Sequence, residues 1–211
     1  MLRKTWMFAL IAWSLTGTAW AQAVMVTQVT GAVTASGKGG VQPAVPFLKL
    51  DEGDKLMLAK NARVQMIYLA NGRQEVWKGD GQVEVGELNG RSPSLKAEAT
   101  QLPASIVSQL KRTPSAGQQG RSGMVMLRSL DDLDASDRLQ KEYTDFRTGA
   151  AADDTTPEVY LLTGLLDLKE YEWAKKVLGD LKNRQLTQPA YEAVVDHFGP
   201  LVERASASSK D

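Results

Sequence analysis

The chain has 211 residues, an apolar fraction of 43% and equal numbers of basic and acidic side chains, 25 of each. This composition is typical of a folded globular chain, and the balanced charge gives no indication of nucleic-acid binding. There is no cysteine, which excludes disulfides, thiolate metal sites and thiol nucleophiles. The single histidine, His197, excludes any site that needs a histidine pair.

The first residues have the three parts of a secretory signal peptide. Two basic residues precede an apolar run from Trp6 to Leu15, and small residues follow. An uncleaved membrane anchor is the alternative, but this run of about ten residues is shorter than the roughly 20 that a bilayer needs. We therefore expect residues 1–21 to be a signal peptide, with cleavage after Ala21 or Ala23, and no membrane span in the mature protein.

Residues 22–90 alternate apolar and polar side chains between turn residues, which is typical of short antiparallel strands. Asn71-Gly72 lies between two alternating runs and predicts a hairpin with a type I′ turn, in which both central residues have positive φ. Gly79-Asp80-Gly81 predicts the next reversal, and Gly37–Gly40 a flexible loop. This spacing predicts a small antiparallel β-domain, either a barrel or a sandwich.

Residues 91–129 have the composition of a connector, because prolines alternate with Gly, Ser and Gln. Within it, residues 103–111 fit a short helix. The stretch MVMLRS, at residues 124–129, fits one more short strand.

From residue 130 to 205 the apolar period becomes helical, and residues 206–211 form a tail. In the stretch TTPEVYLLTGLLDL, Thr156 is the expected N-cap and Pro157 the first helical residue. Its leucines form two adjacent apolar faces, which predicts packing on two sides. The last helix should kink or stop at Gly199-Pro200. The sequence therefore predicts an α+β chain, in which a small antiparallel β-domain precedes a helical hairpin bundle.

Four motifs of the N-terminal half resemble the periplasmic FecR domain over roughly 60 residues. They are VTGAV (29–33), LDEGDKL (50–56), ARVQMIYLANG (62–72) and WKGDGQVEV (77–85). The resemblance implies a location in a Gram-negative periplasm and a role in envelope signalling or assembly with partner proteins. FecR regulators also carry a cytoplasmic anti-sigma segment and a membrane helix ahead of this domain. The sequence shows neither, so we do not expect direct control of a sigma factor.

The helical half resembles a tetratricopeptide hairpin. In that repeat a small alanine lets two helices approach while large residues fill the groove beside it. Lys169 stands where the repeat usually has a turn glycine, and no second copy is evident, so the helices of residues 130–148 and 188–205 are expected to cap the pair. An ordinary four-helix bundle is the alternative. The residues at the packing positions are Leu161, Leu165, Tyr171, Ala174 and Leu178.

Patterns typical of enzymes or metal sites are not found. The acidic runs at residues 131–134 and 153–154 lack the spacing of a calcium loop, and acids at these positions suit the starts of helices. There is no G-x-S-x-G sequence and no lysine-containing phosphate loop. His197 is interpreted as a surface or boundary residue. We expect no catalytic residue, no metal ion and no cofactor.

The sequence favours an exported, non-enzymatic interaction or scaffold protein of the cell envelope that binds a periplasmic protein and no nucleic acid. Leu161, Leu165 and Trp173 are the candidate partner contacts. The alternative is a module that binds cell-wall or other polysaccharide on the β-domain face near Trp77, where an aromatic ring could stack on a sugar. For each of these four residues, burial in the core is the competing interpretation.

Overall fold

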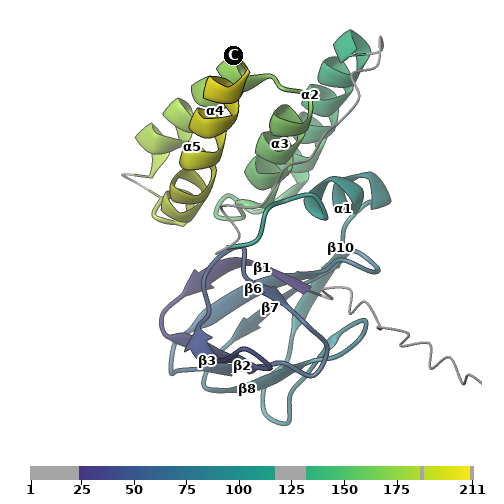
Figure 1. Ribbon diagram of the computed structural model, residues 1–211. Helices are drawn as coiled ribbons and strands as arrows, with labels where there is room; N and C mark the ends of the chain where they lie inside the picture. Colours follow the sequence, from purple (N-terminus) through teal and green to yellow (C-terminus); the bar gives the residue numbers. More distant parts are fainter. Residues whose placement is uncertain (1–23, 117–131, 186–187, 210–211) are drawn as a thin grey trace, which may run out of the picture.

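The computed structural model describes residues 24–116, 132–185 and 188–209. The predicted signal peptide, residues 1–21, and the strand predicted at residues 124–129 lie outside these residues. Within the described residues, two antiparallel sheets of five strands each precede five helices (Figure 1). The predicted α+β class, with a small antiparallel β-domain ahead of a helical bundle, is confirmed.

The two sheets have the strand orders β10-β7-β6-β1-β4, here called sheet A, and β3-β2-β5-β8-β9, here called sheet B. Sheet A consists of β1 (Val24–Thr30), β4 (Lys49–Leu50), β6 (Arg63–Tyr68), β7 (Arg73–Lys78) and β10 (Glu98–Gln101). Sheet B consists of β2 (Val33–Gly37), β3 (Gly40–Pro43), β5 (Lys55–Leu58), β8 (Gly81–Val85) and β9 (Gly90–Arg91).

Sheets A and B enclose an apolar core between them, so the β-domain is a sandwich and the barrel alternative does not apply. Alternate residues of each strand point into this core, as the pleat of a strand requires. Sheet A contributes Val24, Val26, Val64, Met66, Tyr68 and Trp77, and sheet B contributes Val33, Ala35, Leu56, Leu58, Val83 and Val85.

The predicted hairpin at Asn71-Gly72 is present between β6 and β7, but its turn is not of type I′. The Gly72 N–H donates to the Tyr68 carbonyl at 2.8 Å, which closes a wider loop. Gly72 has a φ of +75°, whereas Asn71 is not in the left-handed region. The Asn71 side chain accepts from the Arg73 N–H at 3.0 Å and donates to the Leu88 carbonyl at 2.9 Å. These two bonds hold the wider loop in place of the two-residue turn.

Two other local predictions are also changed by the structure. Gly37–Gly40, predicted as a flexible loop, is the tight connection of the β2–β3 hairpin. The interruption predicted at Gly199-Pro200 is absent, because the last helix continues through Pro200. The short helix predicted at residues 103–111 is confirmed as α1 (Ala104–Leu110).

The remaining helices are α2 (Asp132–Gly149), α3 (Thr156–Asp167), α4 (Tyr171–Arg184) and α5 (Ala190–Ser208). Helices α3 and α4 form a hairpin whose turn places Lys169 at a φ of +60°. In this conformation the Glu170 N–H donates to the Leu165 carbonyl at 2.9 Å, which satisfies an otherwise unpaired carbonyl at the end of α3. None of the described helices is long and apolar enough to cross a membrane.

The helical layer lies on the face of sheet A that points away from sheet B (Figure 1). Met25 and Ile67, on that face, belong to one apolar core with Leu110 of α1 and buried leucines of α3 and α4. The middle of sheet A is therefore covered on both faces, and residues 64–68 of β6 are all buried, whereas the four residues of β10 at its edge are exposed. The two halves of the chain are packed against each other through this shared core.

Candidate functional site

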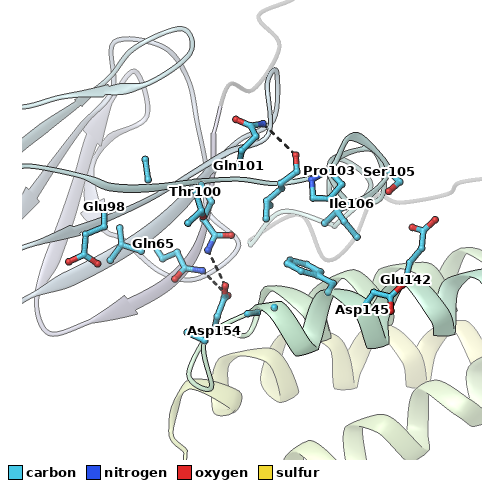
Figure 2. A pocket seen from close by; sticks show the side chains of 18 of the residues that line it. Gln65, Glu98, Thr100, Gln101, Pro103, Ser105, Ile106, Glu142, Asp145 and Asp154 are labelled. Carbon is cyan, nitrogen blue, oxygen red and sulfur yellow. Dashed lines mark hydrogen bonds between the residues drawn. The ribbon is translucent and has the colours of Figure 1, made fainter.

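A cavity of about 690 Å³ opens between sheet A and helix α2, and we call it the sheet–helix cleft. Strands β6, β7 and β10 form one side, the start of α1 closes one end, and the C-terminal half of α2 with the following loop forms the other side. Figure 2 shows Glu98, Thr100 and Gln101 of β10 on one side, and Glu142 and Asp145 of α2 on the other.

The sheet–helix cleft carries more acidic than basic side chains. Its lining includes the carboxylates of Glu98, Glu142, Asp145 and Asp154, against the single guanidinium of Arg63. Apolar side chains lie between them, which gives the cleft a mixed surface suited to a ligand with both apolar and charged parts. The apolar contribution comes from Val76, Leu102, Ile106 and Phe146.

The carboxylates at the mouth of the cleft differ in whether a positively charged side chain lies beside them. Glu98 accepts from the Lys78 ammonium at 2.8 Å, and this hydrogen bond lowers the pKa of Glu98. Among the described residues, Glu142 accepts a hydrogen bond only from the neutral Tyr160 hydroxyl, at 2.7 Å. Asp145 makes no hydrogen bond or ion pair with any described residue. Glu142 and Asp145 therefore leave negative charge at the mouth of the cleft.

Asp154 joins the helical half to sheet A at the inner end of the cleft. Its Oδ1 accepts from the Gln65 amide at 2.8 Å (Figure 2) and from the backbone N–H of Thr156 at 2.9 Å. Its Oδ2 accepts from the Gln74 amide at 3.0 Å. The same carboxylate therefore satisfies an N–H at the start of α3 and anchors two glutamines of adjacent strands.

The amide oxygen of Gln74 has no hydrogen-bond partner in the described part of the chain. Gln74 is 7% exposed and lines the cleft. Its orientation follows from Asp154, because the carboxylate can only accept and so requires the amide nitrogen on its side. Buried acceptors without a donor are rare in folded proteins, and such an atom beside a cavity indicates a place for a ligand donor or a water molecule.

The loop between α2 and α3, which forms one wall of the cleft, is held by Arg147. Its guanidinium donates to the carbonyls of Ala151 and Asp154, the second at 2.6 Å, and contacts the buried Glu158 carboxylate at 3.1 Å. Burial raises the pKa of Glu158, and the charge of Arg147 opposes that shift. Burial and the nearby Glu158 raise the pKa of the Tyr143 hydroxyl to about 12. These contacts tie the loop to the end of α2 and the start of α3.

Strand β10 lies at the edge of sheet A, with all four residues exposed and β7 as its neighbour on one side. The Leu102 N–H donates to the Gly72 carbonyl at 2.9 Å, just beyond the paired residues. Hydrogen-bonded and non-hydrogen-bonded positions alternate along an antiparallel pair, so the backbone groups of Ala99 and Gln101 point away from β7. Both residues line the cleft.

The residues singled out from the sequence lie outside the cleft lining. Leu161 and Leu165 are 2% and 0% exposed in the helical core, and Trp77 is 3% exposed in the sandwich core. The Trp77 indole N–H donates to the buried Glu75 carboxylate at 3.0 Å. Trp173 is half-buried against the helical core. Contact of the first three with a partner would require their neighbours to move.

His197, interpreted from the sequence as a surface or boundary residue, is buried outside the cleft. Its ring stacks on Phe47 at 4.2 Å between centroids, and its Nε2 lies 3.1 Å from the Pro114 carbonyl, which can only accept. Burial lowers the pKa of His197 to about 4. The ring is therefore neutral near pH 7 and helps to pack α5 against the loop that carries Phe47.

Sequence reasoning placed Asp154 correctly at the start of a helix but did not connect it to Gln65 and Gln74. The available signal was the pair of glutamines inside otherwise apolar strands, because a buried amide requires a polar partner. Within the described residues, no group of three or more His, Asp or Glu side chains is arranged to hold a metal ion.

Comparison of the chain with family models, with curated proteins and with solved structures finds no match. The resemblances to the FecR domain and to the tetratricopeptide hairpin therefore stay predictions that depend on sequence motifs alone.

Proposed function

We propose that this chain is an exported, non-enzymatic interaction protein of the bacterial cell envelope, and that it holds a protein partner in the sheet–helix cleft. The observation that supports this proposal is the cleft itself. It combines a strand edge, apolar side chains and carboxylates without a cationic partner among the described residues.

The way the cleft is built favours binding over chemical conversion. Both carboxylate oxygens of Asp154 are used within the fold, by Gln65, Gln74 and the start of α3. Arg147 is likewise occupied by Glu158 and by loop carbonyls. Groups engaged in this way position the walls of a site, whereas Glu142 and Asp145 at the mouth are placed to contact an incoming surface.

The polysaccharide alternative depended on an accessible Trp77 ring. That ring is enclosed between the two sheets, and its N–H is engaged by Glu75. No other observation in the described residues favours sugar binding, so we propose a protein as the partner.

Location in the envelope is part of the proposal, and it depends on the signal-peptide pattern of residues 1–21 together with the FecR resemblance. Fractionation of cells that express the full chain tests it. We expect the protein in the periplasmic fraction with its N-terminus at residue 22 or 24, as read by N-terminal sequencing. A protein that retains Met1 in the cytoplasmic fraction would contradict this part.

Site-specific photo-crosslinking in living cells tests the cleft. A photoreactive amino acid replaces Asp145 in the full chain, and in a control it replaces Lys60, which is exposed in the turn between β5 and β6. We expect an adduct with a defined envelope protein from position 145 and none of that mass from position 60. The same adducts from both positions, or none from position 145, would argue against the proposal.

A further inference from the structure

We propose that the occupant of the sheet–helix cleft is an extended segment of the partner protein, which pairs with β10 as an added strand and directs an Arg or Lys side chain to Glu142 and Asp145. This inference rests on the proposed function and specifies the chemistry of the partner.

The backbone edge of β10 is the first reason. Ala99 and Gln101 direct their N–H and carbonyl groups away from β7, and no other described strand pairs with them. An exposed strand edge is a template for another extended chain, and this mode of peptide recognition recurs in unrelated proteins. Because β10 has four residues, a partner segment of about the same length is enough to pair with it.

The geometry of the sheet then directs the partner's side chains. Residues opposite each other in a pair of strands point to the same face. Glu98 and Thr100 of β10 share a face with Val76 and Gln74 of β7, and all four line the cleft. Every second side chain of an added strand therefore points toward α2, where Glu142, Asp145 and Phe146 face it.

The negative charges that face this side chain favour a cation. Glu98 is matched by Lys78, and Asp154 is used by the fold, whereas Glu142 and Asp145 have no cationic partner among the described residues. These last two lie three residues apart on α2 and so share one face of the helix. The aliphatic part of Arg or Lys can lie on apolar side chains such as Phe146 while its charged end reaches the carboxylates.

The unpartnered Gln74 oxygen gives independent support. This atom belongs to a side chain that is 7% exposed, it lines the same cleft, and it can only accept a hydrogen bond. The Gln74 oxygen inside the cleft and the carboxylates of Glu142 and Asp145 at its mouth are all hydrogen-bond acceptors. A guanidinium, which has five N–H donors and no acceptor, matches such a set.

The test uses a labelled hexapeptide, Thr-Val-Arg-Val-Thr-Val, titrated with the full chain while fluorescence anisotropy reports binding. One control peptide replaces arginine with citrulline, which keeps the shape and removes the charge. Another carries N-methyl groups on alternate backbone nitrogens, which prevents pairing without any change in the protein. We expect each control peptide to bind more weakly by about two- to tenfold, the effect of losing one or two favourable contacts.

Protein variants address the same two features. Ala99→Pro removes an N–H that points away from β7 and leaves the β7–β10 hydrogen bonds intact, since proline is tolerated on a strand edge. Ala99→Val keeps the N–H and is its control. Asp145→Lys reverses the charge at the cleft, and Asp180→Lys on the exposed face of α4 is the charge-matched control. We expect about two- to tenfold weaker binding for Ala99→Pro and Asp145→Lys, and unchanged binding for both controls.

Several outcomes would overturn this inference. They are equal binding of the arginine and citrulline peptides, equal binding of the N-methylated peptide, or a dissociation constant that Ala99→Pro and Asp145→Lys leave unchanged. A dimer of the chain that Ala99→Pro dissociates, measured by sedimentation, would assign the edge to a second copy instead. If crosslinking from position 145 captures a partner while the basic peptide fails, the proposed function stands and only the strand-pairing inference is wrong.

Discussion

Replacement of Asp154 is the most direct test of how the cleft is held together. In Asp154→Ala the NH₂ group of Gln74 loses its acceptor, and the NH₂ group of Gln65 keeps only Thr156 Oγ1, at 3.1 Å. The Thr156 N–H at the start of α3 also loses its acceptor. An unsatisfied buried donor costs about 1–3 kcal/mol, and loss of the acceptor for an N–H at the start of a helix costs about 1 kcal/mol. Water entering from the cleft offsets part of this. We therefore expect a loss of about 2–4 kcal/mol in the free energy of unfolding.

Asp154→Asn separates hydrogen bonding from charge. Its amide oxygen still accepts from Gln65 and Thr156, and its NH₂ group faces Gln74. Because the Gln74 oxygen has no partner among the described residues, the Gln74 amide can rotate by half a turn and accept from the new NH₂. The expected loss is about 1 kcal/mol, clearly less than for alanine.

Urea unfolding followed by far-UV circular dichroism measures these differences. Asp153→Ala is the matched control, because the Asp153 side chain is 64% exposed and its contact with Arg63 spans 3.6 Å. We expect that substitution to change the free energy of unfolding by less than about 0.5 kcal/mol. If Asp154→Ala and Asp154→Asn lower the free energy of unfolding equally, or if Asp154→Ala is as stable as the control, the hydrogen bonds of Asp154 do not hold the two halves together as described.

Three further predictions concern the two cores. Because the pKa of His197 in the folded protein is about 4, below its ordinary value of 6.5, the stability it contributes is present above pH 6.5 and is lost as the pH falls toward 4. Between about pH 7 and pH 5, the free energy of unfolding should therefore fall by about 1–2 kcal/mol more in the wild type than in His197→Gln. The same dependence of this free energy on pH in both proteins would refute the prediction. Gly164→Ala places a Cβ 2.5 Å from the nearest side-chain carbon of α2 and should destabilise the folded protein by about 1–3 kcal/mol. Gly179→Ala is the control, because the space around Gly179 is open and no loss of stability is expected. Equal melting temperatures of the two variants would contradict the close packing at Gly164. Trp77→Phe removes a donor to the buried Glu75 carboxylate and should lower the free energy of unfolding in urea by about 1–3 kcal/mol. The affinity for the peptide should stay unchanged, because Trp77 does not line the cleft. A large change in affinity would indicate that the peptide binds outside the cleft.

The sequence by itself determined the local elements of this protein. Period-two segments became strands, the helical period began after residue 131, and prolines and glycines marked most of the connections. These features depend on interactions between residues a few positions apart, so a window of sequence contains nearly all the information. Even so, the turn at Asn71-Gly72 differs from the prediction, because the Asn71 side chain bonds to Leu88, a residue from another part of the chain.

Packing between distant segments decided which side chains are exposed to a partner and which are buried in a core. Leu161 and Leu165 form apolar faces that suit either a core or a partner, and only the packing of α3 against the other helices buried them. Strand β10 has no apolar alternation in Glu98–Gln101, and it became a strand because its backbone pairs with β7.

The cleft itself is a product of tertiary structure. Its inner end depends on hydrogen bonds from Gln65 and Gln74 to Asp154, between residues 89 and 80 positions apart in the chain. No local pattern encodes such a contact, because a glutamine in a strand and an aspartate before a helix are each common alone. The contact of the two glutamines with Asp154, and the cleft beside it, result from the packing of the helical layer on sheet A.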